Sequence, residues 1–294
     1  KYLSICFLIK VIFKKMSLIV PCAGKSSRFP GMRPKWLLTH PEGNLMVVES
    51  LLGLEMSSIE KIHLVVLREH LKKYKCEQGI LTAFREANLE DKLEIVVLDK
   101  ETKSQPETVY RALQEQNIDG SFYIKDTDNF FVTRLQSGNI VSTYDINKMD
   151  LVHASNKSFV TADEKRVINN IVEKQVISSK FCVGGYGFSD SKEFIRSYER
   201  LENNSDLYVS HIIFDMMLNG AEFQNQDVES YIDWGTIKEW NDFKSQYATI
   251  FIDLDGVLVE NSSSYFEPIW GTTESIQENV DAINKLYHTG KVKI

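Results

Sequence analysis

Short apolar runs alternate with stretches of helical spacing along the chain. The apolar runs are rich in β-branched or aromatic residues and are bounded by turn residues, which is typical of buried strands. They cover residues 18–20, 61–67, 93–98 and 121–125. Helical spacing lies between them at 46–56, at 69–88 and after Ser104, whose distance from Glu107 predicts a capping box. This order predicts an α/β fold, built on a mixed, mostly parallel sheet that is wrapped by helices.

The alternation continues with shorter pieces up to residue 246. Further strands are expected at 150–154, 167–173, 181–188 and 231–236, and further helices at 192–201, 208–218 and 237–246. A second unit is expected from residue 247, because TIFIDLDGVLVEN has the pattern of an apolar strand ending in two carboxylates and helical spacing follows at 274–288. We therefore predict a leader at 1–15, a first domain at 16–246 and the beginning of a second domain at 247–294.

The two ends of the chain have unusual patterns. Residues 1–15 are apolar, but Lys10 interrupts them and they are too short to span a bilayer. We expect Met16 to be the natural start, with a signal anchor as the alternative. The last residues, GKVKI, have the pattern of an opening strand, which indicates a fragment.

Composition narrows the class of partner and the compartment. Lys and Arg number 34 against 41 Asp and Glu, and the net charge of −7 argues against a nucleic-acid or membrane surface and favours a small molecule. The four cysteines are widely spaced without a C-x-x-C pair, so neither a zinc site nor a disulfide framework is indicated. A reducing cytoplasm fits this cysteine usage.

The loop after the first strand combines small residues with cations. It reads AGKSSRFPGMRPK over residues 23–35 and brings Gly24, Ser26 and Ser27 close in sequence to Arg28 and Lys35. Small residues let successive backbone N–H groups converge on an anion, and Arg and Lys side chains neutralise the remaining charge. The pattern predicts a phosphate site, with a solvated surface turn as the alternative.

Carboxylates follow two other expected strands. YIKDTDNFF, at 123–131, contains Asp126 and Asp128, and YIDWGT, at 231–236, contains Asp233. Ligands of α/β sheets bind at the carboxyl ends of strands, and Mg²⁺ takes one or two carboxylates together with substrate phosphates. These side chains can converge only in the folded chain. The alternatives are a polar turn at 126–128 and a helix cap at Asp233.

The three segments, in this order, resemble the motifs of the sugar-1-phosphate nucleotidyltransferases. Those motifs are A-G-x-G-[ST]-R followed by P-K, a strand ending in G-D-N, and a late [WY]-x-D-x-G-T. The resemblance spans residues 16–246 and implies a Rossmann-like, GT-A-like fold. It also implies Mg²⁺-dependent transfer of a nucleotide from a nucleoside triphosphate to a sugar phosphate or a similar phosphorylated acceptor, with release of pyrophosphate.

The resemblance also implies roles for individual residues. Arg28 would clamp the β and γ phosphates, and Lys35 would bridge the attacked α phosphate. The other assignments are nucleotide binding by Ala23, Gly24, Lys25, Ser26, Ser27, Gln105 and Thr108, magnesium binding by Asp128 and Asp233 with Asp126 beside them, and acceptor binding by Glu173, Lys174 and Gly185. Two positions depart from the family pattern, since Ser26 stands where a second glycine is usual and Gln175 where a proline is usual.

A different resemblance begins at Asp253. DLDGVLVEN, residues 253–261, is similar to the first motif of the haloacid dehalogenase superfamily, D-x-D-G-[TV]-[LV]. In that chemistry Asp253 would attack phosphorus and Asp255 would act as general acid and base. The superfamily's later motifs do not occur before Ile294, so phosphatase activity is not expected of this chain. The two motif sets together suggest a bifunctional enzyme of capsular or other surface-polysaccharide biosynthesis.

Two other functions share parts of this pattern. The sequence Asp126-Thr127-Asp128 is also a D-x-D, with which GT-A glycosyltransferases hold a nucleotide sugar through a metal. Such enzymes do not generally need a loop like the one that carries Arg28 and Lys35. A non-catalytic nucleotide-binding module would keep this loop and lack turnover. An oligomer is compatible with the sequence.

Overall fold

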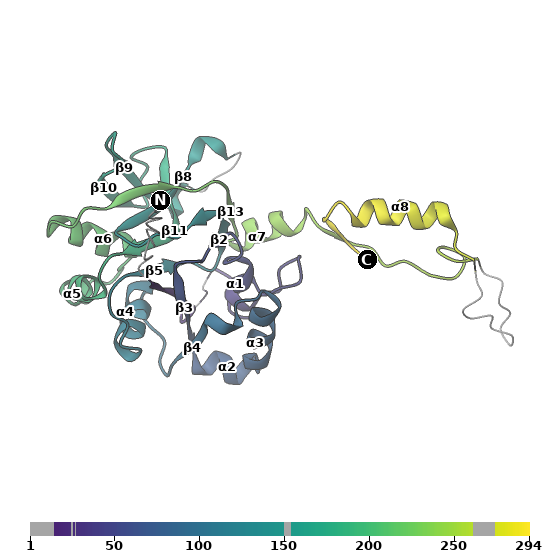
Figure 1. Ribbon diagram of the computed structural model, residues 1–294, viewed down its shortest axis with the longest axis horizontal. Helices are drawn as coiled ribbons and strands as arrows, with labels where there is room; N and C mark the ends of the chain where they lie inside the picture. Colours follow the sequence, from purple (N-terminus) through teal and green to yellow (C-terminus); the bar gives the residue numbers. More distant parts are fainter. Residues whose placement is uncertain (1–14, 25, 27, 150–153, 261–273) are drawn as a thin grey trace, which may run out of the picture. The chain divides into compact units, whose positions relative to one another are not determined.

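The computed structural model describes residues 15–24, 26, 28–149, 154–260 and 274–294 (Figure 1). Backbone contacts divide the chain into two units, residues 1–235 and residues 236–294. No helix in the described ranges combines the length and the apolar character that a bilayer crossing requires. The first unit contains the central sheet, which positions the candidate site.

A mixed sheet of nine strands forms the centre of the described part of the first unit. Its main path runs β10-β9-β11-β5-β1-β3-β4, and β8 pairs with both β11 and β12. Neighbours among β5, β1, β3 and β4 are parallel, whereas β11, β9 and β10 join antiparallel. The bounds are Met16–Pro21 (β1), Ile59–Leu67 (β3), Leu93–Leu98 (β4), Phe122–Lys125 (β5), Ile140–Asp145 (β8), Ser158–Ala162 (β9), Ile168–Glu173 (β10), Lys180–Phe188 (β11) and Gln224–Asp227 (β12).

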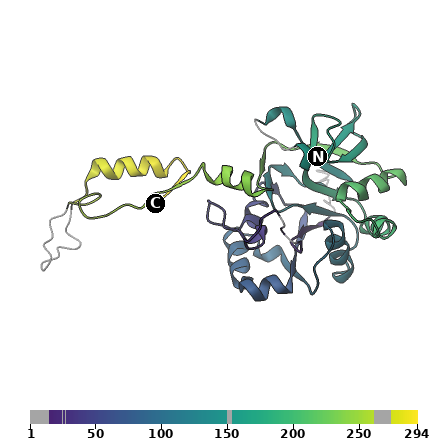
Figure 2. The same ribbon diagram turned by 180° about the vertical axis from the view of Figure 1, so that it is seen from behind.

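Helices cover both faces of this sheet (Figures 1 and 2). They are Met46–Glu49 (α1), Arg68–Tyr74 (α2), Glu77–Glu86 (α3), Gln105–Glu115 (α4), Ser191–Leu201 (α5) and Val209–Leu218 (α6). Side chains of β1 alternate between two buried clusters: Ile19 packs with residues of α4, α5 and α6, whereas Leu18 and Val20 pack with residues of α1 and α3. Because both faces are covered, the strand is apolar at consecutive positions.

The predicted α/β class and mixed sheet are confirmed, but two expected helices differ. The helix expected at 69–88 is divided at Lys75, whose φ of +47° ends α2 before α3 begins. The helix expected at 46–56 ends at Glu49, and beyond it the Gly53 carbonyl accepts a hydrogen bond from the Thr133 N–H group. Leu54–Glu55 (β2) then pair with Thr133–Arg134 (β7). Strand pairing here overrides local helical spacing.

The later strands of the first unit largely follow the sequence pattern. The strands expected at 167–173 and 181–188 correspond to β10 and β11. The strand expected at 231–236 is limited to Tyr231–Asp233 (β13), which pairs antiparallel with Asn129–Phe131 (β6). Of the strand expected at 150–154, residues 150–153 lie outside the described residues, and Ala154 begins a 3₁₀ turn.

The described part of the second unit contains Ile237–Lys244 (α7), Gln277–Tyr287 (α8) and the parallel pair Ala248–Thr249 (β14) and Val292–Lys293 (β15). A capping box begins α7: Thr236 Oγ1 accepts from the Glu239 N–H group at 3.3 Å, and Glu239 Oε2 accepts from the Thr236 N–H group at 2.8 Å. The prediction of a long apolar strand from residue 249 is wrong, since strand pairing ends at Thr249 and Phe251 is 94% exposed. A strand needs a paired neighbour along its length, and β15 supplies one for two residues only.

Gly185 of β11 lies where a side chain would enter the core. A Cβ there would collide with the Tyr123 hydroxyl and would lie 2.7 Å from Phe131 Cζ and 3.1 Å from Ser142 Cβ. We expect Gly185→Ala to lower the free energy of unfolding by about 1–3 kcal/mol, because these neighbours are packed. Urea titration followed by circular dichroism measures this change.

The matched control is Gly79→Ala in α3. A Cβ on Gly79 meets no atom within 4 Å, and alanine favours a helix over glycine by roughly 1 kcal/mol. The control is therefore expected to be neutral or stabilising. Equal destabilisation by the two alanines would contradict the packing argument.

Candidate active site

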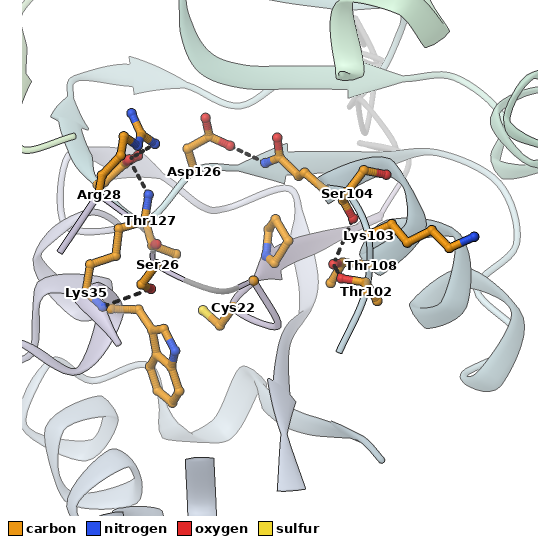
Figure 3. Close-up of a pocket in the computed structure, with 15 residues that line it drawn as sticks. Cys22, Ser26, Arg28, Lys35, Thr102, Lys103, Ser104, Thr108, Asp126 and Thr127 are labelled. Carbon is orange, nitrogen blue, oxygen red and sulfur yellow. Dashed lines mark hydrogen bonds and ion pairs between the residues drawn. The ribbon is translucent and has the colours of Figure 1, made fainter. Parts of the chain in front are cut away.

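The candidate site lies where β1 and β5 end. These strands are adjacent and parallel, so their carboxyl ends open on the same edge of the sheet. The loop after β1 brings Arg28 and Lys35 to this edge, and the turn after β5 brings Asp126 and Asp128 (Figure 3). Segments from separate parts of the sequence thus meet at one edge.

Asp128 is the carboxylate on which both cations of the loop converge. The Lys35 ammonium and Arg28 Nη2, the latter at 3.2 Å, both donate to Asp128 Oδ2. Burial alone would raise the pKa of Asp128, but the charges of Lys35 and Arg28 hold it well below its usual range. Asp128 is therefore ionised at neutral pH, and the loop after β1 is tied to the end of β5 by charge-assisted hydrogen bonds.

Ser26 has a backbone conformation that glycine usually adopts. Its φ is +50°, in the left-handed region. Its hydroxyl oxygen accepts a hydrogen bond from the Lys35 N–H group at 3.2 Å, and its carbonyl accepts from the Phe29 N–H group at 2.8 Å. The serine thus retains the backbone bend expected of a glycine and uses its side chain to fasten the segment that presents Lys35.

The rest of the loop divides between core and cavity. Ala23 is fully buried in the core cluster that contains Ile19, whereas Gly24 lines a cavity at the edge of the sheet. Lys25 and Ser27 lie outside the described residues. Their predicted contacts with a nucleotide stay predictions.

The structure brings Asp128 and Asp233 together, although they are far apart in sequence. Asp233 of β13 lies opposite Asn129 of β6, and the Trp234 N–H group donates to the Asp128 carbonyl at 2.8 Å. A Cβ placed on Gly235 would lie 3.0 Å from Asp233 Oδ1, 3.4 Å from Arg28 Nη1 and 3.5 Å from Asp128 Oδ2. Both carboxylates and the Arg28 guanidinium therefore lie beside Gly235, where a side chain would crowd them.

Two oxygen ligands from these strands are the kind of donor that Mg²⁺ takes together with substrate phosphates and water. Within the described ranges, no group of three or more His, Cys, Asp and Glu side chains is arranged to hold a metal ion. The donor chemistry of Asp128 and Asp233 therefore fits an ion that obtains its other ligands from the substrate.

Asp126 has the opposite electrostatic environment from Asp128. Burial and the neighbouring charge of Asp128 raise the pKa of Asp126. Its carboxylate accepts a hydrogen bond from the Gln105 amide, and its backbone N–H group donates to the Gly184 carbonyl at 2.8 Å. Gly184 has a φ of +78°, and a Cβ there would collide with Asp126 Oδ2 and lie 2.7 Å from Asp126 Cβ. Asp126 is thus packed closely against β11.

Two cavities meet at these carboxylates. The first has a volume of about 390 Å³ and is lined in part by Gly24, Ser26, Lys35, Trp36, Thr102 and Thr108 (Figure 3). The second has a volume of about 450 Å³ and is lined in part by Lys157, Glu173, Lys174, Gly184, Tyr208, Ser210 and Asp233. Both are lined by Arg28, Lys103, Ser104, Gln105, Asp126 and Asp128.

The first cavity contains both residues predicted from the segment at 104–109. Gln105 donates to Asp126, and the hydroxyl oxygens of Thr108 and Thr102 lie 2.6 Å apart. The predicted capping box is confirmed in its first half, because Ser104 Oγ accepts from the Glu107 N–H group at 3.3 Å. The second half differs, since Glu107 Oε2 accepts from the N–H group of residue 103 at 2.6 Å instead.

The second cavity contains two of the three residues predicted to bind an acceptor. Glu173 Oε2 accepts from the hydroxyls of Ser158 and Ser210, the latter at 2.7 Å. The Lys174 ammonium donates to the Tyr208 hydroxyl and lies 4.3 Å from the centre of that ring. The third residue, Gly185, faces the core, and the adjacent Gly184 lines the cavity instead.

Lys125 supports the turn that carries the carboxylates, and the sequence analysis missed it. Its ammonium donates to the Asp126 carbonyl at 2.6 Å, to the Asn129 carbonyl at 3.0 Å and to Asn129 Oδ1 at 2.8 Å. The side chain is fully buried, 4.5 Å from the centre of the Phe131 ring. Burial lowers the pKa of Lys125 to about 7. The sequence feature that could have indicated this role is a lysine at the end of an otherwise apolar strand.

Lys157 is a second residue that the sequence analysis missed. Its ammonium pairs with Asp233 Oδ2 and donates to the Tyr231 hydroxyl at 2.7 Å. The predicted phosphatase residues Asp253 and Asp255 belong to the second unit and are exposed in the segment after β14. Their predicted chemistry stays a prediction.

Comparison with solved structures identifies the fold of the first unit. The nucleoside-diphosphate-sugar pyrophosphorylase from Vibrio cholerae RC9 aligns with a TM-score of 0.62 and 19% identity, over 77% of this chain and 98% of that one. The inositol-1-phosphate CTP transferase from T. maritima aligns with a TM-score of 0.58 and 15% identity, over 77% and 91%. The CTP:phosphocholine cytidylyltransferase from Streptococcus pneumoniae aligns with a TM-score of 0.58 and 14% identity, over 79% and 98%.

The chain therefore has the mixed α/β fold of these solved structures. No family model matches the sequence. A search of curated proteins likewise found no match.

The low pKa of Lys125 predicts a pH-dependent contribution to stability. The pKa is about 7 in the folded protein, whereas a lysine in an unfolded chain titrates near pH ~10.4. Between these values the unfolded chain binds more protons, so the free energy of unfolding rises with pH. The free energy of unfolding of the unsubstituted protein, relative to that of Lys125→Met, should therefore rise by up to about 1.4 kcal/mol for each pH unit between the two pKa values.

Urea titrations at several pH values across the window measure this difference. Lys165→Met is the control, because Lys165 is exposed and should show no such gain. A difference between the unsubstituted protein and Lys125→Met that does not change with pH would rule out this electrostatic contribution.

The two features of Ser26 can be separated by two substitutions. Ser26→Gly removes the hydrogen bond to the Lys35 N–H group but also relieves a left-handed conformation that costs roughly 1 kcal/mol. Ser26→Ala loses the same hydrogen bond but still has a side chain, so the free-energy cost of the left-handed conformation remains. We therefore expect the alanine variant to unfold at a lower temperature than the glycine variant by calorimetry. The reverse order would be inconsistent with the observed φ.

Proposed function

We propose that the chain is a nucleotidyltransferase that joins a nucleoside triphosphate to a phosphorylated small-molecule acceptor and releases pyrophosphate. The observation that carries this proposal is the convergence of Lys35 and Arg28 on Asp128, beside Asp233, where two cavities meet. The fold, which is shared with solved pyrophosphorylases and cytidylyltransferases, supports it.

The reaction needs two substrates side by side, which suits two cavities with a common wall. An oxygen of the acceptor phosphate attacks the α phosphorus of the triphosphate and forms a new P–O bond. The bond from the α phosphorus to the oxygen that bridges to the β phosphorus breaks, and pyrophosphate leaves with that oxygen. The attacking phosphate is already ionised at neutral pH, so no side chain has to remove a proton.

The work of the protein is then positioning and charge stabilisation. We assign the triphosphate to the first cavity, with Lys35 on its α phosphate and Arg28 on the β and γ phosphates. The loop around the triphosphate contains Gly24, Lys25, Ser26 and Ser27. We assign Gln105 and Thr108 to the cavity wall on the nucleoside side. Because Lys35 and Arg28 are held on Asp128 before substrate binds, little of their side-chain entropy remains to be lost.

Asp128 and Asp233 are the residues that would hold Mg²⁺, whose charge would offset that of the phosphates when it is bound. An oxygen of each lies close to Gly235, which supports this assignment. Asp126, whose carboxylate accepts from Gln105, would orient that amide and stay beside the ion.

We assign the acceptor to the second cavity, where Glu173 and Lys174 supply polar groups. A sugar phosphate is the proposed class, and capsular or other surface-polysaccharide biosynthesis is the proposed setting. The segment at 253–261 would then belong to a second activity on a precursor of the same pathway. The free thiols of Cys22, Cys76 and Cys182 support a reducing, cytoplasmic location.

Pyrophosphate release tests this function directly. The unsubstituted protein is incubated with Mg²⁺, each nucleoside triphosphate in turn, and a panel of sugar 1-phosphates, inositol 1-phosphate and phosphocholine. Lys35→Met is expected to lower kcat on the order of a hundredfold or more, because it removes a charge that acts on the α phosphate. Lys165→Met, at an exposed turn, should keep the unsubstituted rate.

Two outcomes would exclude the proposed reaction, one of them in a parallel incubation with nucleotide sugars in place of the triphosphates. Consumption of a nucleotide sugar without pyrophosphate would indicate a glycosyltransferase that uses Asp126 and Asp128. Binding of a triphosphate without turnover of any acceptor would indicate a binding module.

A further inference from the structure

Lys157 lies at the point where the second cavity reaches the carboxylate pair. Its ammonium pairs with Asp233 Oδ2 and is 2.7 Å from the Tyr231 hydroxyl. The side chain is 14% exposed and lines the second cavity. Asp233 and Asp128 both lie beside Gly235. Lys157 is therefore close to the position where the two substrates of the proposed reaction must meet.

The ammonium of Lys157 is held in place by the structure around it. The Lys157 carbonyl accepts from the Lys174 N–H group at 3.0 Å, which fixes the backbone just before β9. The ammonium lies 5.2 Å from the centre of the Tyr231 ring and 5.9 Å from that of Phe181. A lysine held in this way loses little entropy when it binds an anion, whereas an exposed lysine loses more.

We call the point where the second cavity reaches Asp128 and Asp233 the junction. A phosphate that binds at the junction needs a cation because the other side chains there are mostly acidic. Asp126, Asp128 and Asp233 all line the second cavity, and a phosphate entering from that side approaches three carboxylates. Arg28 and Lys35, which are held on Asp128, are assigned to the triphosphate in the proposed reaction, so neither of these two cations of the loop after β1 serves the acceptor phosphate. Repulsion between a phosphate and nearby carboxylates is strong in a partly buried site unless a cation is placed between them.

The two lysines of the second cavity differ in their placement. Lys174 pairs with the Tyr208 hydroxyl and is exposed. Lys157 instead pairs with Asp233, one of the two carboxylates at the junction. A cation at that carboxylate can reach a phosphate that is about to attack the α phosphorus.

We propose that Lys157 binds the phosphate group of the acceptor and holds it for attack, moving from Asp233 to the phosphate when the acceptor enters. The inference rests on the proposed function and names the ligand of this lysine as a phosphate monoester. The Tyr231 hydroxyl accepts a hydrogen bond from the ammonium and keeps it beside Asp233. The group transferred and the bonds that change are those of the proposed reaction.

Steady-state kinetics with each substrate varied in turn test the assignment. With the acceptor that the unsubstituted enzyme uses fastest, Lys157→Met should raise the acceptor KM roughly tenfold or more, as expected for loss of a charged hydrogen bond. The triphosphate KM should stay within about twofold. Lys157→Arg keeps the charge and should recover most of the acceptor affinity. Lys165→Met is the control with unchanged constants.

A merely structural role for Lys157 gives a different result. If Lys157 acts only by holding Asp233, the KM values for both substrates and the Mg²⁺ requirement should rise together in Lys157→Met. That result would overturn the proposal, as would an unchanged acceptor KM. Circular dichroism of each variant establishes that it is folded.

A binding measurement separates this inference from the proposed reaction. Inorganic phosphate is titrated into the unsubstituted protein, Lys157→Met, Lys157→Arg and Lys165→Met, and the shift in unfolding temperature is followed. Roughly tenfold weaker binding in Lys157→Met alone supports the phosphate site even if no pair of substrates releases pyrophosphate. Equal binding by all four proteins, or none by the unsubstituted protein, would overturn it.

Discussion

The candidate site depends on one buried carboxylate that remains charged. Asp128 is removed from solvent at the end of β5, and it stays ionised because Lys35 and Arg28 reach it from the loop after β1. The same contacts hold that loop against the sheet. Removal of one partner would leave an uncompensated charge in a partly buried place, which is generally far more costly than loss of a surface ion pair. The same two ion pairs thus keep Asp128 charged and hold the loop in position.

A second layer of support lies beneath the carboxylates. Lys125 donates to two carbonyl oxygens and one amide oxygen of the turn, and it does so from inside the core. Buried backbone carbonyls need donors, and here one side chain serves two of them while the turn changes direction. The turn therefore has a defined shape without help from a ligand, so its two carboxylates can have opposite electrostatic environments within three residues.

Much of the fold and part of the site could be predicted from local pattern. The strands at 18–20 and 93–98 were evident because a strand covered on both faces is apolar at consecutive positions. The convergence of Asp128 and Asp233 could be expected because both were predicted at strand ends, and the pairing of β6 with β13 provides it. The pairing of β2 with β7 could not, since it joins residues that are distant in sequence. The left-handed bend at Lys75 could not either, because lysine rarely adopts that conformation.

The same reasoning explains which functional candidates were missed. Lys157 lies in a segment with no motif, and its position next to Asp233 exists only in the folded chain. Gly185 was chosen for its place in a pattern, but side chains of a strand alternate between faces, so its neighbour Gly184 lines the cavity. A sequence motif gives the segment, whereas the pleat of the strand decides which of its residues reach the site.

The shared wall between the two cavities has a consequence for how such a protein can diversify. Both cavities are lined by Arg28, Gln105, Asp126 and Asp128. Only the second is lined by Tyr208, which precedes α6, and Ser210, in the first turn of α6. Substitutions at the start of α6 can reshape the pocket on that side without altering a residue of the common wall. Under the proposed assignment of one substrate to each cavity, recognition of one substrate can change over evolution independently of the other, while the residues of the common wall are constrained by both.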